Sequence, residues 1–179
     1  MILIGPKILQ QEYTNDEIKY LNRLLRFTGI GIQNNIHYEF SVRDSKTGLY
    51  NHNFFVSRIT EEIARAKRSK QKFSLIILDI DHFKKLNDVY GHLAGDEVIL
   101  KIADILGETL REEDILSRFG GEEFMVLLPD AGAEAGMGTA ERLREKVEEM
   151  ETPWDGSILK ITASFGIATG RRIDSALAL

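Results

Sequence analysis

The stretch ILSRFGGEEFMVLLP, residues 115–129, decides the fold of this chain. Two short apolar runs flank a Gly-Gly step, which is the pattern of a β-hairpin whose tight turn needs residues that tolerate positive φ. Two carboxylates, Glu122 and Glu123, follow Gly120 and Gly121. Glycines that let another molecule approach the backbone, followed by acids at a strand start, suit a phosphate ester held by metal ions. A solvated hairpin without a ligand fits the turn equally well.

A second stretch, FSLIILDID at residues 73–81, has the pattern of a buried strand that ends in two acids. Because side chains alternate along a strand, Asp79 and Asp81 project from one face near its carboxyl end. Carboxylates are costly there unless a cation neutralises them. If this strand lies beside the hairpin, Asp79 and Glu122 meet across the ladder and share Mg²⁺, which prefers carboxylates, water and phosphate oxygens. Two-metal nucleotidyl transfer requires that arrangement.

The composition restricts the possible classes of function. With 179 residues, the chain has room for one domain of ordinary size and an extension. The net charge of −5 gives no overall basic surface, so we expect no nucleic-acid partner. Cysteine is absent, which excludes disulfides and thiolate metal sites and fits a reducing cytoplasm. No apolar run reaches the roughly 18–20 residues of a membrane span, so we expect no membrane segment and a cytoplasmic protein.

The hydrophobic pattern predicts helices that alternate with strands. Residues 90–96 are expected to form a loop. Strands separated by helices, with one hairpin, indicate a layered α/β sheet that is not purely parallel. Besides the hairpin, we expect strands at residues 73–81 and 159–169, and helices at residues 13–42, 53–69, 82–89, 97–110 and 133–150.

The N-terminal segment has its own pattern. Residues 1–8 are strand-like up to a Gly-Pro break, and Thr14 with Glu17 predicts a capping box that opens the helix at residues 13–42. Two interpretations of this helix stay open: it pairs two chains as a coiled coil, or it packs on its own domain. In a coiled coil, polar Asn35 would favour one register at some cost in stability. The apolar seam consists of Ile18, Leu21, Leu25, Thr28, Ile32 and Asn35.

Three motifs stand in order along the chain. They are DSKTGLYN at residues 44–51, DIDHFKKLND at residues 79–88 and GGEEF at residues 120–124. Together they resemble the GGDEF family of diguanylate cyclases, and the resemblance runs from about Asp44 to about Gly170. It implies a nucleotidyl-cyclase-like or polymerase-palm-like α/β fold, with a mixed, mostly antiparallel central sheet flanked by helices and an N-terminal connecting helix.

The same resemblance implies two parts of the chain. Residues 1–43 resemble the C-terminal end of a GAF sensory domain and a signalling helix, and residues 44–179 resemble a GGDEF domain. The family continues past the SFGIA motif at residues 164–168 with an acid-containing helix and a basic segment that helps hold a triphosphate. No such segment is found before Leu179, so the domain is expected to be truncated at its C-terminus.

The family condenses two GTP molecules into cyclic di-GMP and releases two pyrophosphates. The resemblance therefore implies GTP as substrate, Mg²⁺ or Mn²⁺ as cofactor, and a homodimer, because each site holds one GTP and two must face each other. It assigns the metal to Asp79, Glu122 and the carbonyl of Ile80, and it places Glu123 near the metal and the attacking hydroxyl. Asp79, Glu122 and Glu123 are thus the expected catalytic residues. Taken singly, each acid also fits an exposed turn.

Guanine recognition is assigned by the resemblance to Asn87 and Asp96. A carboxylate accepts from the N1 and N2 hydrogens of guanine, and an amide offers both a donor and an acceptor. Asp96 also fits an ordinary helix N-cap, since Gly95 precedes it and an apolar helix is expected to follow.

Phosphate binding is assigned to two places. Lys84 and the backbone amides from Phe83 to Lys85 are candidates to hold the triphosphate, and Gly120 and Gly121 line the expected substrate site. An exposed lysine without a ligand fits Lys84 as well.

Arg111 and Asp114 have the RxxD form of the family's product-inhibition site and its offset from Gly120. An arginine fork matches a phosphate or a guanine edge, and an aspartate can pair with guanine. Arg142 is a further candidate from a neighbouring surface. The resemblance thus implies cyclic di-GMP as a feedback ligand as well as a product.

The alternative function is a catalytically impaired module that binds GTP or cyclic di-GMP and relays a signal through the helix at residues 13–42.

Overall fold

The computed structural model describes residues 13–69 and 71–170, and the chain divides into two compact units between Ser41 and Val42. The predicted strand at residues 1–8 and the residues after Gly170 lie outside the described part. No helix among the described residues is long and apolar enough to cross a membrane.

Helix α1 (Asn15–Val42) runs through the first unit, close to the predicted range. The predicted capping box is confirmed. The Glu17 amide donates a hydrogen bond to Thr14 Oγ1 at 3.3 Å, and the Thr14 amide donates to Glu17 Oε2 at 2.8 Å. These two bonds satisfy donors that a helix start otherwise leaves free.

The predicted seam of α1 is only partly covered within one chain. Leu21 and Leu25 are half-buried, and the side chain of Asn35 lies outside the described part. An exposed apolar set of this size suits a protein partner, so coiled-coil pairing stays a prediction. The large apolar side chains that α1 exposes are Ile18, Tyr20, Leu24, Phe27, Ile30, Ile32, Tyr38 and Phe40.

The second unit is built on a four-stranded sheet with the order β2-β3-β1-β6. Strands β1 (Phe73–Ile80), β2 (Ile115–Arg118), β3 (Glu123–Leu128) and β6 (Ala163–Gly170) are antiparallel to each of their neighbours. A parallel bridge from Tyr50 to Ser117 extends the β2 edge. The predicted mostly antiparallel sheet, with β1 beside the hairpin of β2 and β3, is therefore confirmed.

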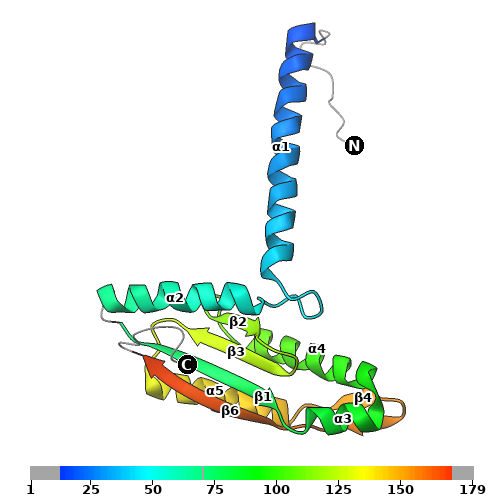
Figure 1. The fold of residues 1–179 in the computed structure, drawn as a ribbon, viewed down its shortest axis with the longest axis vertical. Helices are drawn as coiled ribbons and strands as arrows, with labels where there is room; N and C mark the ends of the chain where they lie inside the picture. The colour runs from blue at the N-terminus through cyan, green and yellow to red at the C-terminus, as the bar shows by residue number, and fades with distance from the viewer. Residues whose placement is uncertain (1–12, 70, 171–179) are drawn as a thin grey trace. The chain divides into compact units, whose positions relative to one another are not determined.

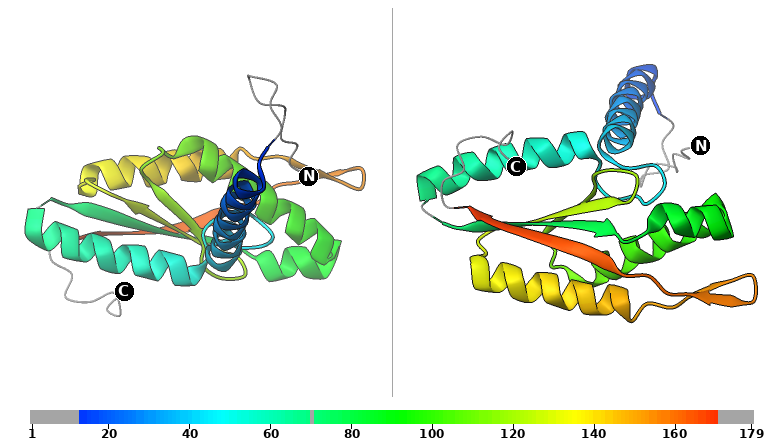
Figure 2. Two further views of the ribbon diagram at one scale, coloured as in Figure 1. Left: turned by 90° about the horizontal axis from the view of Figure 1, so that it is seen from above. Right: turned by 60° about the horizontal axis from the view of Figure 1, so that its bottom comes forward.

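Helices cover both faces of this sheet. Helix α2 (His52–Ser69) lies on one face, and α4 (His92–Thr109) and α5 (Ala133–Glu148) lie on the other (Figure 1; Figure 2). Side chains of β1 alternate between the two cores, as a period of two requires. The α2 side of the core contains Phe55, Ile59, Ile63, Phe73 and Leu75, and the other side contains Ile76, Leu78, Ile80, Val98, Ile102 and Leu143.

One end of the sheet is left open on the α2 face. Ile77 follows Phe73 and Leu75 on that face, yet it is 39% exposed. Asp79 comes next on the same face and is also exposed. The carboxyl end of β1 therefore offers a free surface to a ligand.

Helix α4 begins earlier than the sequence predicts. The expected loop at residues 90–96 is wrong, because α3 (Phe83–Tyr90) is followed directly by α4 through Gly91, whose φ of 85° only glycine adopts readily. Asp96 consequently lies inside α4 and does not cap it. The ordinary N-cap interpretation of Asp96 is excluded, which leaves its carboxylate available for other partners.

A second hairpin was not predicted. Strands β4 (Thr152–Trp154) and β5 (Ser157–Leu159) pair around Asp155 and Gly156, whose φ angles are 43° and 75°. Asp-Gly with two positive φ values is a common two-residue hairpin turn. Because of this hairpin, β6 starts at Ala163 instead of at the predicted residue 159.

Gly136 on α5 packs tightly against the buried Ser74 of β1. A Cβ at Gly136 would lie 2.7 Å from Ser74 Oγ, which donates to the Ala131 carbonyl at 3.1 Å. We expect Gly136→Ala to lower the free energy of unfolding by about 1–2 kcal/mol through this overlap. Gly138→Ala on the same helix meets no atom within 4 Å and should raise the free energy by about 0.5–1 kcal/mol. Urea unfolding measures both values, and equal effects of both substitutions would contradict the packing argument.

Candidate functional site

The acids predicted to act together gather at the open end of the sheet. The register places Asp79 opposite Glu123 on β3 and opposite Ser164 on β6. Glu122 directly precedes β3, and its carbonyl accepts a hydrogen bond from the Ile80 amide at 3.3 Å. Asp79 thus faces Glu123 directly, one position along from the cross-ladder partner Glu122 that the sequence predicted.

The turn before β3 has a different geometry from the predicted one. Neither Gly120 nor Gly121 has a positive φ. A Cβ at Gly120 would instead displace the carboxylate of Glu123, because it would overlap Glu123 Oε2. The amides of Phe119 and Gly120 both donate to the Glu123 carbonyl, at 2.8 and 3.2 Å. The glycine pair therefore lets the loop fold back over the first residue of β3.

These acids suit a hard divalent cation. Within residues 13–69 and 71–170, no group of three or more His, Cys, Asp or Glu side chains is arranged to hold a metal ion. The predicted set of Asp79, Glu122 and the Ile80 carbonyl has only two carboxylate side chains. Mg²⁺ bound there would take its other ligands from water and from phosphate oxygens, as it commonly does.

Asn87 of α3 lies against Gly95 of α4, the residue that directly precedes Asp96. A Cβ at Gly95 would overlap Asn87 Oδ1 and lie 3.0 Å from Phe83 Cζ, so glycine permits the close crossing. Asn87 Oδ1 is buried and has no hydrogen-bond partner in the described structure. The neighbouring Asp96 carboxylate forms an ion pair with Lys46. A half-buried amide beside a carboxylate can read a base edge.

The start of α3 is arranged to receive an anion. Lys84 is exposed, whereas the Phe83 side chain is buried in the core, so only the Phe83 amide can contribute to a ligand. The first bond within this helix runs from the Leu86 amide to the His82 carbonyl at 3.1 Å. The amides of Phe83 to Lys85 therefore precede that bond at the positive end of the helix dipole.

Two residues that the sequence did not assign fix the loops around the acids. Arg118 Nη1 lies 3.3 Å from Asp44 Oδ1, and its Nη2 donates to the Gly121 carbonyl at 2.8 Å. Asp44 also accepts from the Thr47 amide and hydroxyl at 2.9 and 2.8 Å. Arg118 stands two residues before the GGEEF motif and Asp44 opens the DSKTGLYN motif, and neither residue had a predicted role.

Asp81, the second of the two predicted acids, is held by two side chains near the start of β6. It accepts from Thr162 Oγ1 at 2.6 Å and from Ser164 Oγ at 2.7 Å. These two hydrogen bonds hold the pKa of Asp81 below its ordinary value. The bonds join the end of β1 to the start of β6, which indicates a structural role for Asp81.

The lowered pKa of Asp44 should make the free energy of unfolding depend on pH. Burial raises the pKa of Asp44, but the hydrogen bonds from Thr47 and the charge of Arg118 outweigh it, so the net shift is downward. A lowered pKa stabilises the folded state above the ordinary value of 3.8 and loses that contribution as the pH falls below it. We expect Asp44→Asn to be less stable than the parent at pH 6, with the difference narrowing below pH 3.8. Thermal unfolding across this range tests it, and a constant difference would contradict the charge argument.

A separate cavity of about 660 Å³ contains the predicted product-inhibition residues Arg111 and Asp114. The Arg111 amide donates to Asp114 Oδ2 at 2.9 Å. Burial raises the pKa of Asp114, while the Arg111 amide and, to a smaller extent, the charges of Arg111 and Arg142 oppose the shift. The structure thus brings these three residues into one electrostatic environment.

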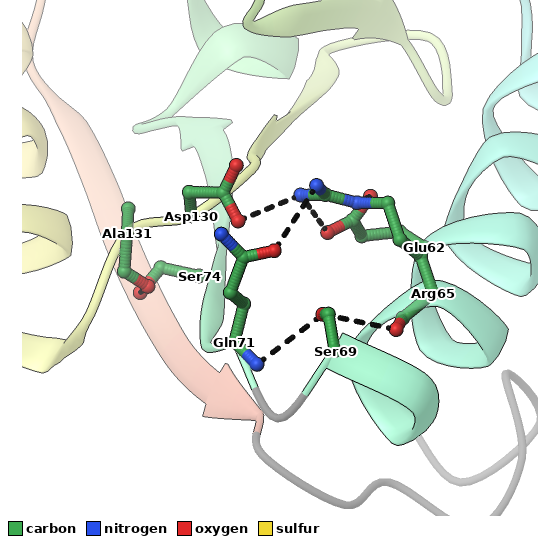
Figure 3. A network of polar contacts seen from close by, with 7 residues as sticks. All are labelled: Glu62, Arg65, Ser69, Gln71, Ser74, Asp130 and Ala131. Atoms are coloured by element: carbon green, nitrogen blue, oxygen red, sulfur yellow. Dashed lines mark hydrogen bonds and ion pairs between the residues drawn. The ribbon is translucent and has the colours of Figure 1, made fainter.

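A further arginine lines this cavity. Arg65 of α2 pairs with Glu62 at 2.8 Å and with Asp130 at 2.9 Å, and its Nη1 lies 3.4 Å from Gln71 Oε1 (Figure 3). The pairs join α2 to the turn after β3. The cavity walls from α2 and from residues 128–131 are thereby held together.

The antiparallel sheet flanked by helices, with acids at its open end, is the architecture that the sequence resemblance implies. The family model described as "Diguanylate cyclase, GGDEF domain" matches residues 41–177. The chain therefore belongs to the GGDEF family of diguanylate cyclases. The predicted family is confirmed, whereas the GAF-like character of the segment before it stays a prediction.

The curated relatives that the chain matches are named as diguanylate cyclases. The chain is 34% identical over 172 residues to diguanylate cyclase A of Treponema denticola, covering 94% of this chain and 46% of that protein. It is 46% identical over 127 residues to diguanylate cyclase DgcP of Pseudomonas aeruginosa, covering 71% of this chain and 19% of that protein. The chain therefore spans less than half the length of either relative.

Solved structures show the same architecture. The coiled coil and GGDEF domain of DgcB from Caulobacter crescentus, in complex with c-di-GMP, matches with a TM-score of 0.84 and 25% identity over 92% of this chain and 88% of that one. Diguanylate cyclase SiaD from Pseudomonas aeruginosa, in complex with its activator SiaC, matches with a TM-score of 0.76 and 33% identity over 91% and 65% of the two chains.

Proposed function

We propose that this chain condenses two GTP molecules into cyclic di-GMP, as a homodimer that depends on Mg²⁺ or Mn²⁺. The observation that carries the proposal is the register of β1 and β3, which sets Asp79 opposite Glu123 and beside Glu122 at the open end of the sheet. The family membership of residues 41–177 supports the same reaction.

In the proposed reaction, the 3′-oxygen of each GTP forms a bond to the α-phosphorus of the other. The bond from that phosphorus to the pyrophosphate oxygen breaks and pyrophosphate leaves, while the hydroxyl proton passes to Glu123 and from there to water. A divalent cation held by Asp79, Glu122 and the Ile80 carbonyl would neutralise the charge that builds on the reacting oxygens. Glu123 lies beside this set, and its carboxylate is proposed to accept the proton of the attacking hydroxyl. The exposed end of the sheet leaves this site open to the GTP that a second chain would hold.

Substrate binding is proposed to use α3 and α4. Asn87 and Asp96 would read the guanine, and Lys84 with the amides at the start of α3 would hold the phosphates. The position of half-buried Asn87 against Gly95, next to Asp96 in the chain, supports this assignment.

The dimer is proposed to form through α1. Its exposed apolar side chains would pair two chains and face two GTP-loaded domains toward each other. Residues 1–43 would then relay a signal to the GGDEF domain at residues 44–179. We place this activity in the cytoplasm, which the absence of cysteine fits.

The proposal is tested by incubating the chain with GTP and Mg²⁺ and separating the products by chromatography. Cyclic di-GMP should form, at a specific rate that rises with protein concentration because the reaction needs two chains. Cyclic di-GMP formation that requires no divalent metal would contradict the metal assignment. If no product forms while calorimetry still shows binding of GTP or cyclic di-GMP, the chain is instead a signal-relaying module without cyclase activity.

Product binding at Arg111, Asp114 and Arg142 is the second part of the proposal. We expect Arg111→Ala to weaken binding of cyclic di-GMP by at least about tenfold, because a charge-assisted hydrogen bond is lost. The initial rate of GTP turnover should stay unchanged, since the cavity lies apart from Glu122. Arg68→Ala, on the exposed surface of α2, is the matched control. If Arg111→Ala binds cyclic di-GMP as tightly as the parent does, this cavity is not the product site.

A further inference from the structure

The ion pair between Lys46 and Asp96 joins two motifs that lie fifty positions apart. Lys46 stands in the turn at residues 44–49, and Asp96 stands in the first turns of α4. Both side chains are partly covered, with exposed fractions of 38% for Lys46 and 37% for Asp96. No part of the proposed reaction has so far used Lys46.

The turn that carries Lys46 is held rigidly. The Gly48 amide donates to the Asp44 carbonyl at 2.9 Å, and the Asp44 amide donates to the Leu49 carbonyl at 2.8 Å. Gly48 has a φ of 70°, which closes the turn. Asp44 is fixed in addition by Thr47 and Arg118. These hydrogen bonds fix the backbone of the turn, so the fold sets the backbone position of Lys46 near Asp96.

A partly exposed ion pair contributes little stability by itself. The ammonium can therefore exchange one of its contacts for a contact with a ligand at small cost. Lys46 also has three N–H donors, so binding a new acceptor does not require it to leave Asp96.

We propose that Lys46 is a specificity residue that donates a hydrogen bond to O6 of guanine. This inference rests on the proposed function, in which Asp96 accepts from N1–H and N2–H. On the Watson–Crick edge of guanine, O6 lies directly beside N1. A cation bonded to one oxygen of the carboxylate that accepts from N1–H therefore lies next to O6.

The same arrangement rejects adenine. Adenine carries an amino donor where guanine carries O6, and its N1 has no hydrogen. The ammonium of Lys46 would meet the amino group, and the Asp96 carboxylate would meet the lone pair of N1. Lys46 and Asp96 thus form a donor and acceptor pair that matches guanine at each position.

Lys46→Met tests the proposal, because methionine keeps the apolar stem and removes the ammonium. Binding is measured by calorimetry with GTP and with 6-thio-GTP, in EDTA so that no turnover occurs. In 6-thio-GTP a sulfur, a weaker acceptor, replaces O6 and leaves N1–H and N2–H in place. We expect Lys46→Met to weaken GTP binding by about tenfold or more and 6-thio-GTP binding much less. Lys46→Arg should restore part of the preference, and Lys67→Met on α2 should change neither affinity.

Two results would overturn the role of Lys46. An equal loss for both nucleotides would show that the lysine only supports the turn, and tighter GTP binding would show that it blocks the site. Asp96→Ala separates this failure from failure of the proposed function. If the parent does not bind GTP, or if Asp96→Ala binds it equally well, the guanine site itself is wrong and the proposal for Lys46 fails with it.

Discussion

Glu122→Gln is expected to lower the rate of cyclic di-GMP formation by about 10²–10³-fold, because a metal that stabilises the transition state contributes several kcal/mol. Glutamine keeps the shape of the side chain but removes the charge that would hold the cation. The backbone bond from the Ile80 amide to the Glu122 carbonyl is unaffected, so the fold should be retained. Chromatography of the products gives the rate, and thermal unfolding checks the fold.

Two measurements make this result specific to the site. Glu108→Gln removes a carboxylate from the exposed end of α4 and should leave the rate unchanged. Binding of cyclic di-GMP should survive in Glu122→Gln, since Arg111 and Asp114 lie in a separate cavity. A Glu122→Gln variant that keeps the parent rate would remove Glu122 from the metal site, whatever the effect of the control.

The sheet followed from the sequence because its strands are strongly marked. Residues 73–80 form an apolar run that ends in acid, and the hairpin has apolar runs on both sides of Gly-Gly. The strand order and the cross-strand partner of Asp79 were not available from that pattern. Register depends on which residues of two distant segments pair, and a shift of one position changes the partner from Glu122 to Glu123.

The errors lie at segment ends, where local signals compete. Gly91 and Gly95 suggested a loop, but Gly95 sits inside α4 because its missing side chain lets α4 approach Asn87. The Asp155-Gly156 turn was visible in the sequence, yet the strands on either side of it are only three residues long. Such short strands give too little alternation to be recognised.

The residues that hold the site were harder to predict than those expected to act in it. Acids at a strand end have a chemical meaning of their own, whereas Arg118, Lys46 and Asp44 acquire theirs only through contacts over long sequence distances. Arg118 meets Asp44 across 74 positions, and Lys46 meets Asp96 across 50. Only the folded chain shows that Arg118 links Asp44 to the Gly121 carbonyl, and that Lys46 from the same turn contacts Asp96 of the proposed guanine site.

Arg118→Met is expected to lower the free energy of unfolding by about 3 kcal/mol, because it leaves a partly buried carboxylate without its cation and a carbonyl without its donor. Arg118 is only 13% exposed and Asp44 is 24% exposed, so water cannot fully replace either contact. The bond to the Gly121 carbonyl also fixes the loop that carries Glu122. Cyclic di-GMP formation should therefore fall as well. Urea unfolding and the product assay measure the two effects.

Arg144→Met is the matched control, because Arg144 pairs with Glu141 at 2.7 Å and with Glu148 at 2.6 Å but lies on the surface of α5. Its loss should lower the free energy of unfolding far less than Arg118→Met does, since exposed ion pairs are weak. Equal destabilisation by both variants would show that burial of Arg118 does not matter.

A double variant, Arg118→Met with Asp44→Ala, tests whether Arg118 stabilises the fold through Asp44. If it does, the losses of stability in the two single variants must sum to more than the loss in the double variant. Because the Gly121 contact remains separate from Asp44, activity should stay low in that double variant even where part of the stability returns.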